Sequence, residues 1–97
     1  MPAYMVAGVE LMPGPALERY RSLAGPSIAA HDGSFLVREQ EKALTEGKHR
    51  FRRVIIVRFP SLEQAERCYR SADDAEALRL SGQAMHRTLY IVDGVPP

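Results

Sequence analysis

Two arginines in strand-like segments are the residues of this sequence best suited to bind an anion. Arg38 follows the apolar run Phe35–Val37, and a guanidinium there can hold a carboxylate through two parallel hydrogen bonds. Arg58 alternates with Val54 and Ile56, where a buried charge is costly unless another group neutralises it. Both have structural alternatives, because Arg38 can be an exposed charge that protects an edge strand and Arg58 can pair with a structural carboxylate.

Three further residues could transfer protons. His31 follows the first predicted helix, whose dipole favours the protonated imidazole and could poise it near neutral pH. Tyr20 and Tyr69 fall on apolar helical stripes, from which each could present its hydroxyl to a cleft. The alternatives are a histidine that only caps its helix and two tyrosines that pack in the core with satisfied hydroxyls.

Metal and thiol chemistry have little support in the sequence. The three histidines lie far apart, without the two- or four-residue spacing of a metal site, so we expect no metal and no cofactor. We expect His86 at the surface. Cys68 is the only cysteine, which excludes an intramolecular disulfide, and we expect a packed thiol rather than a nucleophile.

The length and charge of the chain limit its class. A chain of 97 residues is expected to form one domain over residues 1–97. Thirteen Lys and Arg against twelve Asp and Glu give a net charge of +1, so no global field attracts nucleic acid or an anionic membrane. The N-terminus lacks a secretion signal, and no apolar run is long enough to cross a bilayer. We therefore expect a soluble cytoplasmic protein with no membrane partner.

The elements that must position these residues follow the order β-α-β-β-α-β. Breakers at Pro13–Pro15 end the first strand, Gly33 is expected as the left-handed residue that ends the first helix, and Ser61 with Gln64 forms a capping box for the second. We predict strands over Ala3–Leu11, Ser34–Arg38, 51–59 and Arg87–Asp93, a helix over Pro15–Ala30 kinked at Pro26, a helix after Ser61, and a bent helical piece over Ala72–Gly82.

The apolar patterns of the four strands predict a sheet that is dry on both sides. The strand at 51–59 carries four consecutive apolar residues and should be central, whereas strict alternation around Phe35 and Val37, with Arg38 on the opposite face, is typical of an edge strand. The second helix is expected to turn a stripe that includes Cys68 and Tyr69 inward. Two helices cover only one side of a four-stranded sheet, so an identical chain is the simplest cover for the other.

Three segments resemble a known bacterial family. The segments His31–Arg38, Phe59–Ala65 and Tyr69–Ser71 are similar to domain of unknown function 1330 (DUF1330). The resemblance implies a ferredoxin-like α+β sandwich, with a four-stranded antiparallel sheet, that pairs into a dimeric α+β barrel and often holds a small ligand in a cleft of each subunit. Proteins of that superfamily include cofactor-free monooxygenases, heme-handling proteins and isomerising or ring-closing enzymes.

The resemblance also compares individual positions. Arg38, Tyr69 and Ser71 match the family. The resemblance also adds Ser71 to the predicted substrate-binding residues, which are then Arg38, Arg58 and Ser71. The departures are Glu39 and Gln40 where two glycines are usual, Arg58 where an acid is common, Cys68 at a usually aromatic position, and Asp74 near a common tyrosine. If the family binds its ligand through an arginine and a carboxylate, the carboxylate has been lost or moved here.

Three function classes follow. The first is a cofactor-free enzyme of isomerase, cyclase or monooxygenase type, acting on a small aromatic or polyketide-like acid, with Arg38 or Arg58 as anion anchor and His31, Tyr20 or Tyr69 in proton transfer. The second is a homodimer that binds or senses a ligand without turnover. The third is an RNA-binding module that uses the basic run Lys48–Arg53, but valine and isoleucine stand where bases would stack, so we do not expect it.

Overall fold

The protein folds in the predicted order of elements, as described by a computed structural model for residues 1–48, 50–71, 79–80 and 82–96. All strand pairs of its sheet are antiparallel, in the order β2-β3-β1-β4, which confirms the ferredoxin-like α+β prediction and the inner position of β3. The elements are β1 (Ala3–Leu11), α1 (Pro15–Ala30), β2 (Ser34–Glu41), β3 (Arg53–Phe59), α2 (Leu62–Arg70) and β4 (Met85–Asp93).

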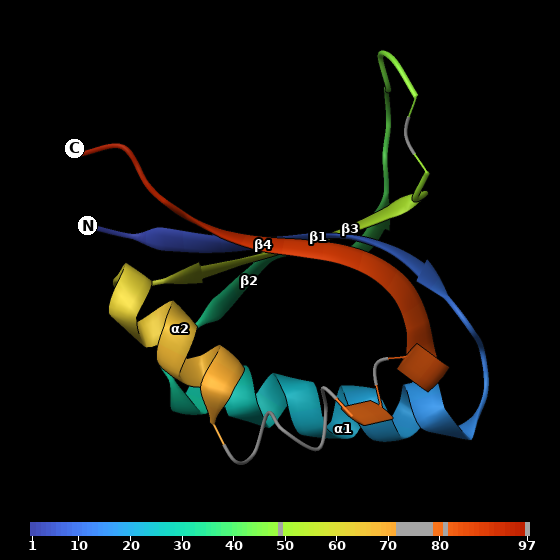
Figure 1. Cartoon of the computed structure of the whole chain (residues 1–97), viewed down its shortest axis with the longest axis horizontal. Helices are drawn as coiled ribbons and strands as arrows, with labels where there is room; N and C mark the ends of the chain where they lie inside the picture. The colour runs from blue at the N-terminus through green and yellow to red at the C-terminus, as the bar shows by residue number, and fades with distance from the viewer. Residues whose placement is uncertain (49, 72–78, 81, 97) are drawn as a thin grey trace.

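Both helices pack on one face of the sheet (Figure 1). Every second residue of β1 from Ala3 to Val9 is buried on that face, because side chains of a strand alternate between its two sides. Leu17 and Ile28 of α1 and Ala65 of α2 supply the opposing layer. The core therefore lies between the helices and one side of the sheet.

The other side of the sheet carries no helix in the described part of the chain, and we call it the open face (Figure 1). Several of its apolar side chains stay exposed, with Tyr90 at 59% and Val92 at 45%. The even-numbered residues that form it are Tyr4, Val6, Gly8 and Glu10 of β1, Val54, Ile56 and Arg58 of β3, and His86, Thr88, Tyr90 and Val92 of β4. The prediction of a sheet with apolar side chains on both sides thus holds for this chain.

The connection between β2 and β3 rises from the open face as a long hairpin (Figure 1). We call its described residues within 42–52 the arm. Phe51, at the base of the arm, lies over Gly8, where an added Cβ would be 3.1 Å from the phenyl ring. Leu44 near the tip is 92% exposed. The arm therefore stands beside the open face rather than covering it.

Strand β2 departs from the alternation that the sequence predicted. The register pairs Phe35 with Val57 and Arg38 with Ile55, and it shifts once between Phe35 and Val37 and again between Arg38 and Gln40. An extra residue at each shift forms a β-bulge, which turns the following side chain to a new direction. Arg38 consequently shares the helix-covered side with Phe35, and the prediction that placed them on opposite faces was wrong.

The end of α1 also differs from the prediction. The helix spans Pro15–Ala30 as predicted, but Asp32 rather than Gly33 adopts the left-handed conformation, with φ 61°. Gly33 serves another purpose, because a Cβ there would lie 2.7 Å from both the Ile28 side chain and the Phe59 ring. A glycine thus lets the chain return to the sheet against a closely packed core.

Helix α2 begins as predicted, with the side chain of Ser61 accepting a hydrogen bond from the backbone N–H of Gln64. Cys68 is fully buried, but Tyr69 is exposed, so its expected place on the inward stripe was wrong. Successive helix residues point about 100° apart, and the small Ala65 and Cys68 occupy the direction that faces the sheet. The predicted piece over Ala72–Gly82 lies largely outside the described residues.

No helix in the described segments is long and apolar enough to span a membrane.

Candidate functional site

A narrow cleft lies between α1 and the helix-covered side of the sheet. Its floor is apolar, and its polar groups come from α1, the bulged part of β2 and the start of β4. The lining consists of Met5, Ala7, Tyr20, Arg21, Ala24, Ile28, Phe35, Arg38, Glu39, Ile55, Val57 and Arg87. Ligand sites of proteins commonly combine such an apolar lining with a few converging polar groups.

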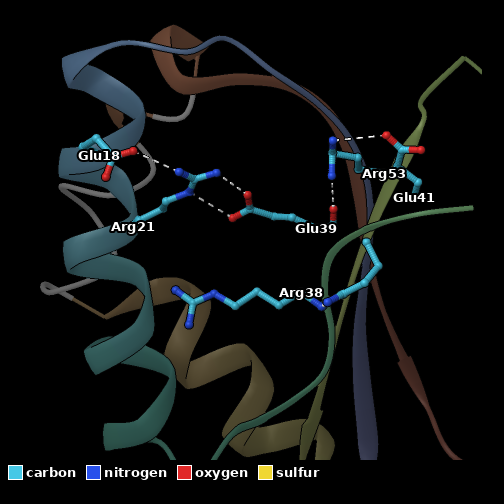
Figure 2. A network of polar contacts seen from close by, with 7 residues as sticks. Glu18, Arg21, Arg38, Glu39, Glu41 and Arg53 are labelled. Atoms are coloured by element: carbon cyan, nitrogen blue, oxygen red, sulfur yellow. Dashed lines mark hydrogen bonds and ion pairs between the residues drawn. The ribbon is translucent and has the colours of Figure 1, made fainter.

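Arg38 extends from β2 toward α1 inside this site (Figure 2). Its guanidinium carbon lies 4.4 Å from the centre of the Phe35 ring, and Nη2 lies 3.6 Å from the place that a Cβ at Gly25 of α1 would occupy. Within the described part of the chain no carboxylate pairs with Arg38. The side chain is therefore placed to receive an anion from outside the protein.

The neighbouring Glu39 lies at the mouth of the cleft in a two-point ion pair with Arg21 (Figure 2). The contacts are 3.2 Å from Nε to Oε2 and 2.5 Å from Nη2 to Oε1, and only 14% of the Glu39 side chain is exposed. The hydrogen bond that Arg21 donates to Glu39 raises the pKa of the Arg21 guanidinium above its ordinary value, with a smaller contribution from the nearby Glu18. This pair therefore ties α1 to β2.

The backbone around Glu39 is unusual. Glu39 has φ 66°, a left-handed conformation that costs a residue with a side chain roughly 1–2 kcal/mol relative to glycine. Arg53 donates to its carbonyl oxygen at 2.8 Å and to Glu41 at 3.2 Å, which braces the bulge from β3. Glu39 therefore holds its carboxylate in a backbone conformation that favours glycine.

Tyr20 and Arg87 form the second polar pair of the cleft. Arg87 of β4 donates from Nη1 to the Tyr20 hydroxyl at 3.0 Å, and its guanidinium carbon lies 5.9 Å from the centre of the tyrosine ring. A cation on a phenol oxygen favours negative charge that develops there. Tyr20 is therefore the predicted proton-transfer residue that the structure brings into the same cleft as Arg38.

The cleft is nearly closed in this conformation. Its internal space is about 30 Å³, enough for a water molecule or two but far below the several hundred Å³ of a typical ligand pocket. The Arg21–Glu39 and Tyr20–Arg87 pairs both join α1 to the sheet. A ligand must therefore displace one of these contacts or move α1 away from the sheet.

The other predicted site residues lie outside this lining. His31 is the C-cap residue of α1, and its Nδ1 donates to the carbonyl oxygen of Ser27 at 2.8 Å. Ser71 is the C-cap residue of α2, and its hydroxyl donates to the carbonyl oxygen of Cys68 at 2.9 Å. Tyr69 is at the surface of α2. These three side chains are not brought together with Arg38.

Arg58 lies on the open face, on the opposite side of the sheet from Arg38. It is exposed, so the expectation that it is buried among the apolar residues of its strand was wrong for this chain. Tyr4 and Ser34 are its cross-strand neighbours. The long arginine side chain extends past them and keeps its guanidinium in contact with solvent. Arg38 and Arg58 therefore cannot both bind the same small ligand within one subunit.

Sequence reasoning missed Arg21, Glu39 and Arg87 as members of the site. A signal existed for Arg87, because it shares the two-residue spacing of Leu89 and Ile91 on the buried side of β4. No pattern indicated Glu39, since its direction depends on the bulges. Position 74, the remaining family departure, lies outside the described residues.

The described residues contain no group of three or more His, Cys, Asp or Glu side chains that could hold a metal ion.

The family model for domain of unknown function DUF1330 matches residues 2–95. The chain belongs to the DUF1330 family. This confirms the resemblance seen in the sequence, and it covers nearly the whole chain, including every residue of the cleft. No curated protein sequence matches this DUF1330 protein.

Solved structures with the same fold resemble this DUF1330 protein over most of their length. A protein of unknown function from Rhodopseudomonas palustris is 20% identical, with a TM-score of 0.70, over 99% of this chain and 84% of that one. The cofactor-independent oxygenase SnoaB from Streptomyces nogalater is 13% identical, with a TM-score of 0.65 and coverages of 99% and 95%. A dimeric protein of unknown function from Bacteroides fragilis is 7% identical, with a TM-score of 0.52 and 96% of each chain covered. At these identities the similarity establishes the fold alone.

Proposed function

We propose that the cleft between α1 and the sheet binds a small organic acid with an aromatic or polyketide-like body. Arg38 would hold the carboxylate, while Ile55 and its apolar neighbours in the lining would receive the body. The observation that carries the proposal is that Arg38 reaches into an apolar cleft and has no carboxylate partner in the described part of the chain. A guanidinium in such surroundings gains most from an anion that accepts two parallel hydrogen bonds.

The same cleft supports proton transfer without a cofactor. The Tyr20 hydroxyl, held by Arg87, would lend a proton to the bound acid or take one from it. Isomerisation, ring closure or oxygenation could follow on a substrate that itself forms a stabilised carbanion. The fold shared with a protein described as a cofactor-independent oxygenase supports this class. Since His31 and Tyr69 do not line the cleft, the proposal assigns proton transfer to Tyr20.

Binding without turnover is the alternative within the same site. The cleft is nearly closed, and the Arg21–Glu39 and Tyr20–Arg87 pairs hold α1 against the sheet. Binding of an acid would therefore require a change of conformation. A protein that responds only in this way would sense the acid rather than convert it. Only a measurement of product separates these two functions.

We also propose that the protein acts as a homodimer joined through the open face. Exposed apolar side chains such as Val92, at 45%, and Tyr90 would be covered in this way. The dimeric description of the Bacteroides fragilis protein supports the assembly. Cys68, the only cysteine of the chain, is a buried thiol, and this fits the reducing cytoplasm, where we place the protein.

The binding test compares benzoate with neutral benzamide by isothermal titration calorimetry. We expect Arg38→Ala to weaken benzoate binding by roughly tenfold or more and to change benzamide binding little, because only benzoate has a carboxylate for the guanidinium. Arg67→Ala on the exposed side of α2 is the matched control. Equal benzoate affinity in the Arg38→Ala protein and the wild type would refute the anion site.

The catalytic test uses a dihydroxynaphthoate, an aromatic acid that can form a stabilised carbanion. Oxygen uptake and product formation that depend on Tyr20 would establish an oxygenase, and product without oxygen uptake would indicate isomerisation or ring closure. Binding of the acid with no product would exclude turnover of this substrate and favour the sensing alternative.

A further inference from the structure

We propose that Arg58 of one copy pairs with Glu10 of a second copy across two open faces that pack together. In this arrangement the end of one sheet that carries the arm lies against the opposite end of the other sheet. This inference rests on the proposed homodimer and adds its geometry. It gives each subunit one residue in each of two symmetric ion pairs. It also assigns to Arg58 a partner that the single chain does not provide.

Arg58 and Glu10 are exposed charges near opposite ends of the open face. Arg58 lies opposite Tyr4 in the register, and Glu10 lies six residues further along β1, opposite His86 of β4. At about 3.4 Å per residue, roughly 20 Å separates the two charges along the strand. In the described part of the chain neither residue has an ion-pair partner.

The nearest competing cation for Glu10 within its own chain points elsewhere. Arg53 pairs with Val9 in the register, so Arg52 is the next residue of that segment toward Glu10. Arg52 lines a hollow of the arm together with Glu41 and Lys42. Glu10 thus lies at the edge of the open face beside its cross-strand neighbour His86, and among the described residues no lysine or arginine forms an ion pair with it.

A two-fold axis that crosses the strands at the level of Ala7 relates the two charged ends. Ala7 lies between Tyr4 and Glu10 on β1, and beside it the row Ile56–Val6–Tyr90 crosses the centre of the open face. This axis sets the apolar row against Val54, Gly8 and Thr88 of the second copy, and it brings Arg58 to the level of Glu10 of the second copy, about one strand spacing of 4.8 Å to the side. Packed sheets lie about 10 Å apart, a distance that an arginine and a glutamate side chain together can bridge.

An axis parallel to the strands would bring like charges together. It would set Arg58 at the same level as Arg58 of the second copy, and Glu10 at the level of Glu10. It would also place both arms, each with Lys48 and Arg50, at the same end of the dimer. Like charges facing each other across an interface disfavour that arrangement, so charge selects the axis that crosses the strands.

Charge reversal tests the pairing by sedimentation equilibrium. We expect Arg58→Glu or Glu10→Arg alone to raise the dimer dissociation constant by roughly tenfold or more, since each change replaces two attractive pairs with two repulsive ones. The combined swap should return the constant to within about threefold of wild type. Arg70→Glu on α2 is the control with equal charge change and should leave the constant unaltered, and circular dichroism confirms that each variant is folded.

A cysteine pair tests the orientation independently. The two positions are roughly 20 Å apart within one chain, so a bis-maleimide with a reach of about 10 Å, matched to the spacing of packed sheets, should join the Glu10→Cys, Arg58→Cys protein into a covalent dimer, whereas Glu10→Cys alone should not be joined. Efficient cross-linking of Glu10→Cys alone would establish the parallel axis and overturn the proposal.

The outcomes separate this inference from the proposals on which it rests. A wild-type protein that stays monomeric at micromolar concentration would refute the homodimer, and the pairing with it. A wild-type dimer that tolerates both single reversals would refute the pairing alone. Benzoate binding measured on the same variants reports on the cleft, which lies on the other side of the sheet, and should be unchanged in each.

Discussion

Arg21 on α1 and Glu39 on β2 form an ion pair with contacts of 2.5 Å and 3.2 Å that closes the mouth of the cleft. The pair places a carboxylate beside Arg38 without neutralising Arg38 itself. Glu39 thus supplies a carboxylate on the side of the sheet that carries the cleft. A bound acid has to compete with Glu39 for the cations at this entrance.

Replacing Glu39 by glycine should open the cleft at little cost in stability. Glycine removes left-handed strain of roughly 1–2 kcal/mol and the variant loses a partly buried ion pair, so the free energy of unfolding should change by no more than about 1 kcal/mol. Benzoate should bind more tightly because Arg21 is released. Urea unfolding and calorimetry check both effects.

Glu39→Ala is the matched comparison. It loses the same ion pair but keeps a Cβ at φ 66°, so we expect it to be less stable than Glu39→Gly by roughly 1 kcal/mol. Equal stability of the two variants would mean that the backbone relaxes out of the left-handed conformation.

Tyr20→Phe should separate binding from catalysis. The variant keeps the ring but removes the hydroxyl that accepts from Arg87, so benzoate affinity should stay within about threefold of wild type. If the protein turns over a dihydroxynaphthoate, kcat should fall by roughly 10²–10⁴-fold. Tyr69→Phe, at the surface of α2, should retain full activity, and an active Tyr20→Phe protein would show that another group transfers the proton.

Gly33→Ala should destabilise the fold. The added methyl group would lie 2.7 Å from both the Ile28 side chain and the Phe59 ring, and overpacking of this kind typically costs roughly 1–3 kcal/mol. Thermal unfolding measures the loss as a lower Tm. At Gly82 a new Cβ would meet nothing within 4 Å among the described residues, so Gly82→Ala should leave Tm unchanged or raise it slightly.

The thiol of Cys68 should resist modification in the native protein. The residue is fully buried, and its sulfur lies 3.8 Å from both the hydroxyl and the carbonyl oxygen of Ser27. A thiol reagent should therefore react only as fast as the protein opens, and rapidly in denaturant. Fast stoichiometric labelling of the folded protein would contradict the packing of α1 against α2 at this point.

The element order, the inner position of β3, the edge position of β2 and the cap of α2 could all be predicted from the sequence. Each of them depends on local signals, namely apolar period, breakers and capping residues. The four consecutive apolar residues from Val54 to Val57, for example, identify an inner strand without knowledge of its neighbours.

The cleft could be predicted only in part, because its geometry depends on two bulges. Tyr20 and Arg38 were recognised as candidates, but the face that Arg38 occupies and the participation of Glu39 follow from register shifts between β2 and β3. A bulge arises from the fit of one strand to another, and the local sequence carries little sign of it. Arg58 was misplaced for a related reason, since alternation identifies two faces of a strand but not which face the helices cover.

The irregular backbone of β2 also limits how copies of the protein can associate. A further strand that paired with this edge of the sheet would need an evenly spaced row of free N–H and C=O groups. The two bulges of β2 interrupt that row. Edge-to-edge growth through β2 into a continuous sheet is therefore disfavoured, whereas face-to-face packing does not use this edge.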